Sequence, residues 1–272
     1  MTEQIFSKNG LYYRMNEFRE NQLTLVFIHG LSGSSSAWLP YENFFKDKYN
    51  TLSLDLRGHG KSPKFKNYSD YEMGKLAEDV NDLIDHLGIK NFVLIGHSFG
   101  TLVAFEFLIH HQEKVRAVVF ISPNIAVGKI KIAHLFKPLF NIFKPLVGFW
   151  KFSPRVGKHI DYSNYKNTGD WNLRRMFADI SNTGLRAYFY GTLQSYEQNF
   201  ELILERIKIP VLIIHGEKDT IFPIENSKAM MTKIKDSKFV SLPNADHILV
   251  LNNFSEVSNE ISKFLVEYKN AL

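Results

Sequence analysis

The chain has 272 residues, of which 44% are hydrophobic, so it can bury a large core and has the length of one large α/β domain, with or without an insert. Its 33 basic and 28 acidic side chains are interspersed and leave a net charge of +5, a mild excess that gives little reason to expect nucleic acid as a partner. The chain has no cysteine, which excludes disulfides, thiol chemistry and cysteine metal sites.

The N-terminal stretch MTEQIFSKNGLYYRM lacks the basic start and apolar run of a secretory signal, and we expect a cytoplasmic protein. Within this stretch Asn9-Gly10 joins two short β-like runs and favours a type I′ hairpin turn. Further along, continuous apolarity indicates strands covered on both faces, as in a parallel sheet. Four runs are of this kind and two weaker candidates accompany them: residues 23–28, 92–95, 115–121 and 211–214, then 49–56 and 237–242.

Helical segments separate these runs, and the clearest covers residues 69–88. Ser69 and Glu72 are predicted to form a capping box at its start, and Gly88 closes its end. Alternating strands and helices with short links predict right-handed βαβ units. The expected fold class is therefore α/β, with a doubly wound, mostly parallel sheet.

The alternation stops near residue 122 and resumes near residue 209. We therefore expect a core in two segments, 1–122 and 209–272, around an insert of residues 123–208. In the insert the sequence FKPL occurs twice, and a lysine recurs every seven residues at Lys137, Lys144 and Lys151. The surrounding stretch is rich in Phe, Leu and Trp, but its charges argue against a transmembrane span.

The stretch LIGHSFG, residues 94–100, puts Ser98 between two glycines, directly after an apolar strand and before a helical run. In a doubly wound sheet, ligands bind beyond the carboxyl ends of the strands, where Ser98 is expected to lie. A turn this tight needs Gly96 and Gly100, because a Cβ at either position would collide with a neighbouring strand or helix. With these flanks the pattern indicates a nucleophile elbow. The alternative is a glycine-rich turn whose serine only caps the helix.

A serine hydroxyl is a poor nucleophile at neutral pH and needs a base, which in turn needs an orienting carboxylate. Both are expected at later strand ends. VLIIHGEKDTIFP offers Asp219 just past a buried strand, and SKFVSLPNADHILV offers His247 after the last strand. Asp246 is the weaker candidate for the acid, because a side chain adjacent to His247 usually points away from it. The order Ser98, Asp219, His247 is that of the α/β-hydrolases.

On these motifs the sequence resembles the α/β-hydrolase superfamily over essentially its whole length, and the insert is similar to that family's helical lid. The resemblance implies an oxyanion hole made by two backbone amides. One belongs to Phe99, after the nucleophile, and the other to Leu31 in the loop FIHGLSGSS, where Gly30 and Gly33 let the backbone turn. The resemblance also implies that His29 has a structural role.

Several polar residues near the expected strand ends are interpreted as structural. Asp55 and His59 belong to DLRGHGKS, which is similar to a family loop that shapes the domain without chemistry. His97 and His215 follow the pattern of hydrogen-bonded neighbours packed beside strand ends. Thr101 departs from the family pattern, which often has a small residue after the second glycine.

Serine instead of aspartate at the elbow argues against the dehalogenase and epoxide-hydrolase branches of the family, which need a carboxylate nucleophile. We expect an acyl-enzyme on Ser98, with His247 as general base and acid and Asp219 orienting the imidazole. The aromatic-rich insert predicts an apolar pocket. The leading interpretation is a carboxylesterase or monoacylglycerol-lipase-like hydrolase of esters with apolar acyl or aryl groups.

Two alternatives stay open. A carbon–carbon bond hydrolase of ring-cleavage products uses a similar triad and lid, and Arg174, Arg175 or Arg186 would then hold the substrate carboxylate. A ligand receptor of this fold would keep the triad and signal through lid movement. We expect a small-molecule ester as partner, no nucleic acid, weak lipid-interface contact through the lid, and a monomer or homodimer. No cluster of residues has metal-ligand spacing, and no cofactor is expected.

Overall fold

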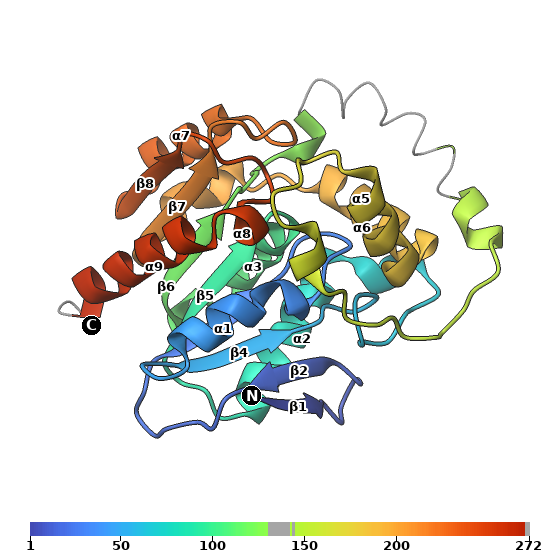
Figure 1. Cartoon of the computed structure of the whole chain (residues 1–272), viewed down its shortest axis with the longest axis horizontal. Helices are drawn as coiled ribbons and strands as arrows, with labels where there is room; N and C mark the ends of the chain where they lie inside the picture. The colour runs from blue at the N-terminus through green and yellow to red at the C-terminus, as the bar shows by residue number, and fades with distance from the viewer. Residues whose placement is uncertain (130–141, 143–144, 270–272) are drawn as a thin grey trace.

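The computed structural model describes residues 1–129, 142 and 145–269. Its strands form one eight-stranded sheet in the order β1-β2-β4-β3-β5-β6-β7-β8 (Figure 1). From β4 to β8 all neighbouring strands are parallel, which confirms the predicted, mostly parallel sheet. All six predicted strands are present: β3 (Thr24–Ile28), β4 (Asn50–Leu54), β5 (Phe92–His97), β6 (Val115–Ile121), β7 (Val211–Gly216) and β8 (Ser237–Leu242).

The N-terminal hairpin is present, but its turn differs from the prediction. β1 (Thr2–Ile5) pairs antiparallel with β2 (Tyr12–Met15), and β2 pairs antiparallel with β4. A type I′ turn requires positive φ at both central residues, and here Gly10 has a φ of 77° whereas Asn9 is not in the left-handed region. Asn9 instead donates from its side chain to Asp79 Oδ1 over 2.9 Å. The hairpin is closed by a longer loop, residues 6–11.

Helices cover both faces of the sheet, as a doubly wound fold requires. α1 (Leu39–Phe45) and α9 (Phe254–Lys269) lie on the face in front in Figure 1, and α2 (Met73–His86), α3 (Phe99–His111) and α7 (Ile224–Lys233) pack on the other. Successive strand residues alternate between the two cores. In β3, for example, Leu25 and Phe27 face one core while Val26 and Ile28 face the other, and all four are fully buried.

The predicted start of α2 is wrong. Ser69 lies inside a short 3-10 helix (Tyr68–Tyr71), and the backbone is extended at Glu72, so α2 begins only at Met73. Asp70, not Glu72, accepts the capping hydrogen bond, from the backbone N–H of Asn67 over 3.0 Å. The predicted end is correct, since Gly88 has a φ of 64° just after the helix.

The insert lies beside the carboxyl ends of the strands (Figure 1). It contains a 3-10 helix (Tyr162–Tyr165), α5 (Leu173–Thr183), α6 (Leu185–Glu197) and a second 3-10 helix (Glu201–Arg206). The first FKPL repeat, Lys137 and Lys144 lie outside the described residues, and the second repeat does so in part.

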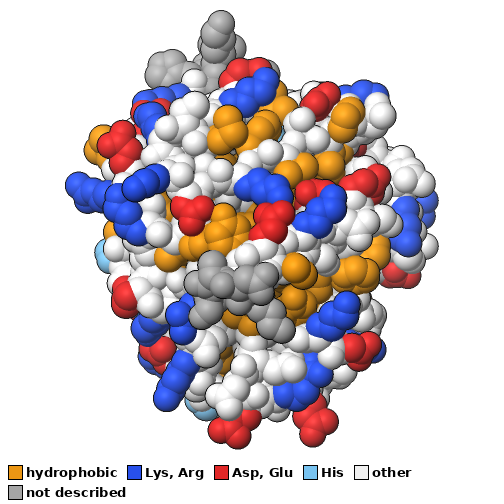
Figure 2. Space-filling view, turned by 90° about the vertical axis from the view of Figure 1, so that its left-hand side faces the viewer, with side chains coloured by type: hydrophobic (Ala, Val, Ile, Leu, Met, Phe, Trp, Pro, Cys, Tyr) orange, Lys and Arg blue, Asp and Glu red, His pale blue; other side chains and the backbone are white. Residues whose placement is uncertain are grey.

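Charges of both signs share the surface on the side where α7, α9 and β8 lie. Figure 2 shows Lys and Arg side chains interspersed with Asp and Glu across this face, with hydrophobic side chains between them. Within the described ranges, no helix is both long and apolar enough to cross a membrane.

Candidate active site

Ser98 occupies the sharp turn between β5 and α3 that the sequence predicts. Its φ of 52° and ψ of −116° lie outside the regions that L-residues usually adopt. A Cβ added to Gly96 would lie 2.7 Å from the carbonyl O of Gly100, and one added to Gly100 would lie 2.7 Å from the carbonyl O of His29. The two glycines are therefore required by backbone approach on both sides of the turn. Thr101 is buried, and its hydroxyl donates to the Ser98 carbonyl over 2.6 Å.

The structure brings Ser98, His247 and Asp219 together at the carboxyl edge of the sheet. His247 Nε2 lies 2.8 Å from Ser98 Oγ, and His247 Nδ1 lies 2.8 Å from Asp219 Oδ2. A carboxylate only accepts hydrogen bonds, so Nδ1 carries a proton. In the neutral ring Nε2 is then the acceptor for the serine hydroxyl. Asp246 instead faces Asn252 and the backbone N–H of Ile248. Ser98, His247 and Asp219 thus form one continuous chain of hydrogen-bond contacts.

Four donors surround the Asp219 carboxylate. Its Oδ1 accepts from the backbone N–H groups of Ile221 (2.9 Å) and Phe222 (2.8 Å), and its Oδ2 faces His247 and, at 3.2 Å, His215 Nε2. Burial would raise the pKa of Asp219, but hydrogen bonds from His215 and His247 and the charge of His247 outweigh burial and lower that pKa well below its ordinary value. Asp219 therefore stays ionised beside His247.

The two expected oxyanion donors lie beside the serine. Leu31 and Phe99 both line the cavity that contains Ser98 and His247. Phe99 is the first residue of α3, where backbone N–H groups have no partner inside the helix. A Cβ on Gly30 would be 3.4 Å from Ser98 Cβ, which places the Leu31 loop directly against the nucleophile.

Two further histidines near Ser98, the buried His29 and the half-buried His97, make structural hydrogen bonds. His97 Nε2 lies 2.9 Å from the carbonyl O of His247, and burial, with the charge of His247, lowers the pKa of His97 to about 3. His29 accepts at Nε2 from the backbone N–H of Leu56 over 3.0 Å, and burial lowers its pKa. Both are neutral at neutral pH. His97 therefore supports the His247 loop, and His29 supports the chain around Gly30.

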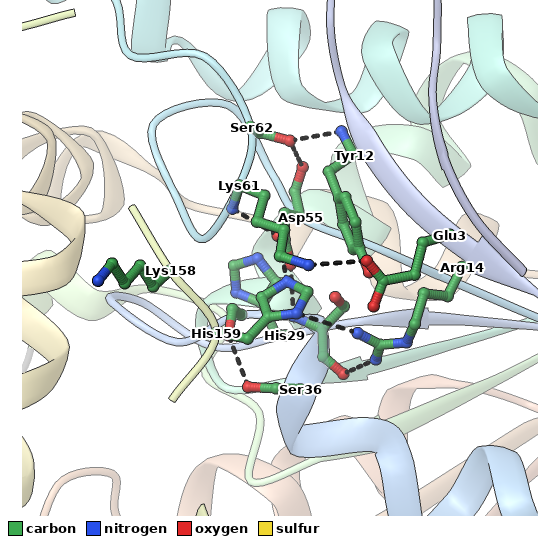
Figure 3. Close-up of polar contacts among 12 residues, drawn as sticks. Glu3, Tyr12, Arg14, His29, Ser36, Asp55, Lys61, Ser62, Lys158 and His159 are labelled. Carbon is green, nitrogen blue, oxygen red and sulfur yellow. Dashed lines mark hydrogen bonds and ion pairs between the residues drawn. The ribbon is translucent and has the colours of Figure 1, made fainter. Parts of the chain in front are cut away.

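Asp55 connects the core to the insert (Figure 3). Its carboxylate accepts from the backbone N–H groups of Ser35 (2.6 Å) and Lys61 (2.8 Å) and lies 2.8 Å from Nε2 of His159, a residue of the insert. Burial would raise the pKa of Asp55, but the hydrogen bond and charge of His159 lower it to about 2. His59 is fully buried, and burial, with the charge of His29, lowers its pKa to about 3. These contacts agree with the structural roles expected for this loop.

A cavity of about 390 Å³ opens over Ser98 and His247. Side chains of the core and of α5 and α6 enclose it, and most of them are apolar or aromatic. These include Leu31, Trp38, Phe99, Leu102, Val127, Met176, Tyr188, Tyr196, Ile221, Phe222, Ile248, Val250 and Leu251.

The insert also contributes polar side chains to this cavity that sequence reasoning missed: Tyr162, Asp170 and Asp179. The Tyr162 hydroxyl donates to Asp179 Oδ1 over 2.9 Å, and burial raises the pKa of Asp179 to about 6. Of the arginines weighed as carboxylate ligands, Arg175 lines the cavity. Arg174 instead lies over the Tyr165 ring, and Arg186 donates to backbone carbonyls of Lys66 and Gly148. No local pattern marks these positions, because they become neighbours of Ser98 only through the fold.

Among the residues that the structure describes, no group of three or more His, Asp or Glu side chains is arranged to hold a metal ion. The polar groups that face one another at the site are Ser98, His247 and Asp219.

The sheet topology and the Ser-His-Asp arrangement define an α/β hydrolase. A family model described as "alpha/beta hydrolase fold" matches residues 24–254, and the chain belongs to this family.

Relatives within the family have diverse activities. The chain is 27% identical to the bifunctional esterase/perhydrolase DCH of Acinetobacter calcoaceticus, over 96% of this chain and 98% of that protein. It is 24% identical to mouse epoxide hydrolase 4, over 89% of this chain and 73% of the relative. The crystal structure of the enol-lactonase from Burkholderia xenovorans superposes with a TM-score of 0.74 at 20% identity, covering 97% of this chain and all of the other. At this identity the likeness to a solved structure shows the fold.

Proposed function

We propose that the protein is a serine hydrolase that cleaves carboxylic esters of apolar acyl or aryl groups through an acyl-enzyme on Ser98. The observation that carries the proposal is the continuous hydrogen-bonded chain from Ser98 Oγ through His247 to Asp219, at the floor of a largely apolar cavity. A serine hydroxyl in hydrogen-bond contact with a neutral imidazole is the arrangement that acyl transfer requires.

In the proposed reaction, Ser98 Oγ attacks the acyl carbonyl while His247 Nε2 takes its proton. The N–H groups of Leu31 and Phe99 stabilise the negative charge that develops on the carbonyl oxygen. His247 then protonates the departing alcohol, and the acyl group remains on Ser98. Water, deprotonated by His247, attacks this ester and releases the acid. Asp219 keeps the imidazole in the required tautomer and stabilises its charged form.

The cavity supports a small substrate. A volume of about 390 Å³ lies toward the lower end of the range for small-molecule sites, about 300–1,000 Å³, which suits a medium-chain or aryl ester. Because most of the lining is apolar, burial of the acyl or aryl group drives binding and the polar site contacts only the ester.

Epoxide hydrolysis fits the site less well, although some relatives are named epoxide hydrolases. The branches of the family that open epoxides or remove halides use a carboxylate as nucleophile, and position 98 is serine. A serine at the elbow with its own imidazole base favours acyl transfer.

Carbon–carbon bond hydrolysis is the second candidate, and Arg175 is the observation that favours it. Arg175 lines the cavity and is 8% exposed, so it would meet a substrate carboxylate. However, its Nη2 donates to the Asp170 carbonyl over 2.7 Å, and its Nη1 lies 3.7 Å from the Asp179 carboxylate. The Asp179 carboxylate compensates its charge in part, although Arg175 Nε has no hydrogen-bond partner within the described residues. Because the cavity lining is mostly apolar, we favour esters.

The insert is proposed to act as a lid that also contacts lipid or micelle surfaces weakly. Leu173 and Phe177 on the outer side of α5 are 77% and 76% exposed, and the cationic Arg174 lies between them in sequence. An exposed apolar surface with basic neighbours favours interfacial contact. Co-sedimentation with phosphatidylcholine and phosphatidylglycerol vesicles, compared with a Leu173→Ser/Phe177→Ser variant, tests this; equal pelleting of both proteins would contradict it. The cytoplasmic location stays a prediction from sequence.

The proposed function is tested by hydrolysis of p-nitrophenyl esters of increasing chain length, together with labelling by a fluorophosphonate probe. We expect turnover with a maximum at medium chain length, and label on Ser98. The matched control is Ser62→Ala, a buried serine outside the cavity whose hydroxyl donates to the Asp55 carbonyl. Preferred turnover of a vinylogous diketone acid would favour the carbon–carbon hydrolase, and absence of label on Ser98 would reject both serine mechanisms.

A further inference from the structure

Asp170 belongs to the insert, yet its carboxylate is hydrogen-bonded to the two core loops that hold the base and the acid. Its Oδ1 accepts from the backbone N–H of His247 over 2.8 Å. Its Oδ2 accepts from Thr220, from the backbone N–H over 3.0 Å and from the hydroxyl over 2.7 Å. Asp170 is 8% exposed, so these bonds form away from competing water.

These contacts reinforce a direct hydrogen bond between the two loops, which the backbone N–H of Lys218 donates to the Ala245 carbonyl over 2.9 Å. Thr220 follows Asp219 in the loop after β7, whereas His247 lies in the loop after β8. The Asp170 carboxylate adds a second link, which joins the N–H of His247 itself to the residue next to Asp219. Two contacts of the His247 ring depend on the relative position of the two loops. They are the hydrogen bond from Nδ1 to Asp219 Oδ2 and the contact between Nε2 and Ser98 Oγ.

Asp170 is itself held firmly. The Arg175 guanidinium donates to its carbonyl over 2.7 Å, and the indole N–H of Trp171 donates to the Thr220 hydroxyl over 2.9 Å. The Thr220 hydroxyl thus accepts from Trp171 and donates to Asp170. Nearby, the Asn252 side chain donates to the Thr168 carbonyl over 2.9 Å. The segment 167–171 is therefore attached to the core at several points around the triad.

We infer that Asp170 is a positioning residue, through which the insert sets the geometry of the His247–Asp219 pair. The inference rests on the proposed serine-hydrolase function. The insert is then a functional part of the catalytic unit as well as a cover, and segment 167–171 keeps its place during turnover. A misplacement of reacting groups by an ångström costs on the order of 100-fold in rate, so loss of this carboxylate acts on kcat rather than on substrate binding.

The test compares Asp170→Ala and Asp170→Asn with the wild type, using p-nitrophenyl ester kinetics and the rate of fluorophosphonate labelling. Asp170→Ala is expected to lower kcat and the labelling rate about 10- to 100-fold, with KM changed less than about twofold. Asp170→Asn keeps one acceptor oxygen and is expected to fall between Ala and wild type. Thr220→Val, which removes one donor from the core side, should shift kcat in the same direction by a smaller factor.

Two control variants separate positioning from general loosening of the insert. Asp161→Asn makes the same change in an exposed carboxylate of the insert that accepts from the neighbouring Ser163 N–H. His159→Ala removes an insert–core contact at Asp55, away from the triad. Both are expected to keep the wild-type kcat, and His159→Ala is expected to lower the melting temperature.

A folded Asp170→Ala variant with wild-type kcat, or one that changes only KM, overturns the inference, as does an equal loss of kcat in His159→Ala. If the wild type neither cleaves esters nor labels, the proposed function fails. The positioning is then judged by hydrogen exchange at the His247 and Thr220 amides. Faster exchange in Asp170→Ala than in the wild type supports the positioning contact, and unchanged exchange rejects it.

Discussion

Replacing Ser98 by alanine and by glycine separates catalysis from backbone strain at the same position. Both changes remove the hydroxyl that contacts His247, so both are expected to reduce ester turnover about a million-fold, to near background. The two variants differ in one respect. Alanine keeps a Cβ on a backbone with a φ of 52°, whereas glycine adopts this conformation freely.

The size of the stability difference follows from this geometry. A non-glycine residue held in a sparsely populated conformation costs about 1–3 kcal/mol, which only glycine relieves. Glycine loses more entropy on folding, which costs about 0.5–1 kcal/mol. The loss of the hydrogen bond to His247 is common to both variants and cancels. Ser98→Gly is therefore expected to be about 1 kcal/mol more stable than Ser98→Ala, or about 2 °C higher in melting temperature for a chain of this size.

The assay is chemical denaturation of both variants in parallel, with thermal melting as a second measure and p-nitrophenyl ester hydrolysis to record the loss of activity. A glycine variant that is equally or less stable than the alanine variant would refute the idea that the elbow is strained. Residual turnover well above background in both variants would refute Ser98 as the nucleophile.

Three further predictions concern the acid, the elbow and the link to the insert. Asp219→Asn is expected to lower kcat about 10⁴-fold, because an amide cannot hold the His247 tautomer. Asp82→Asn, at a half-exposed carboxylate that pairs with Lys8, is the control and should leave kcat unchanged. Gly100→Ala is expected to destabilise the fold by about 3 kcal/mol or more in urea unfolding, because its Cβ would meet fixed backbone carbonyls. Gly74→Ala should not, because its Cβ would make an ordinary contact, 3.7 Å from a side-chain oxygen of Glu106. The pKa of Asp55 falls to about 2 from 3.8 in the unfolded chain, so the carboxylate contributes about 2 kcal/mol of stability above about pH 5 that disappears as pH falls toward 2. The difference in unfolding free energy between wild type and Asp55→Asn should shrink over that range.

Each of these has a result that contradicts it. Near-normal kcat in Asp219→Asn would mean that another group orients His247. A Gly100→Ala protein as stable as wild type would show that a Cβ fits in the β5–α3 turn, contrary to the short distances to neighbouring backbone carbonyls. A stability gap for Asp55→Asn that stays constant from about pH 5 to about pH 2 would remove the link between the Asp55 charge and its contact with His159.

Sequence periodicity and local motifs predict the core of the fold well, because each signal resides in contiguous residues. Apolar runs locate the parallel strands, and the two glycines around Ser98 locate the elbow, since both reflect steric demands of neighbouring backbone. Where several local conformations have similar energies, the prediction fails. There are two such cases. The conformation of the Asn9-Gly10 turn depends on the contact of Asn9 with Asp79. The start of α2 at Met73 depends on the extended backbone at Glu72.

The sequence by itself determined the order and type of the groups in the proposed triad, Ser98, Asp219 and His247. Each follows a strand whose carboxyl end must reach the same edge of the sheet. Only the tertiary structure decided which side chains of the insert meet them. Asp170 and His159 sit in irregular chain with no period that relates them to the sheet, and their partners lie far away in sequence. Contacts of this kind are set by how the insert packs over the strand ends, which is a property of the whole fold.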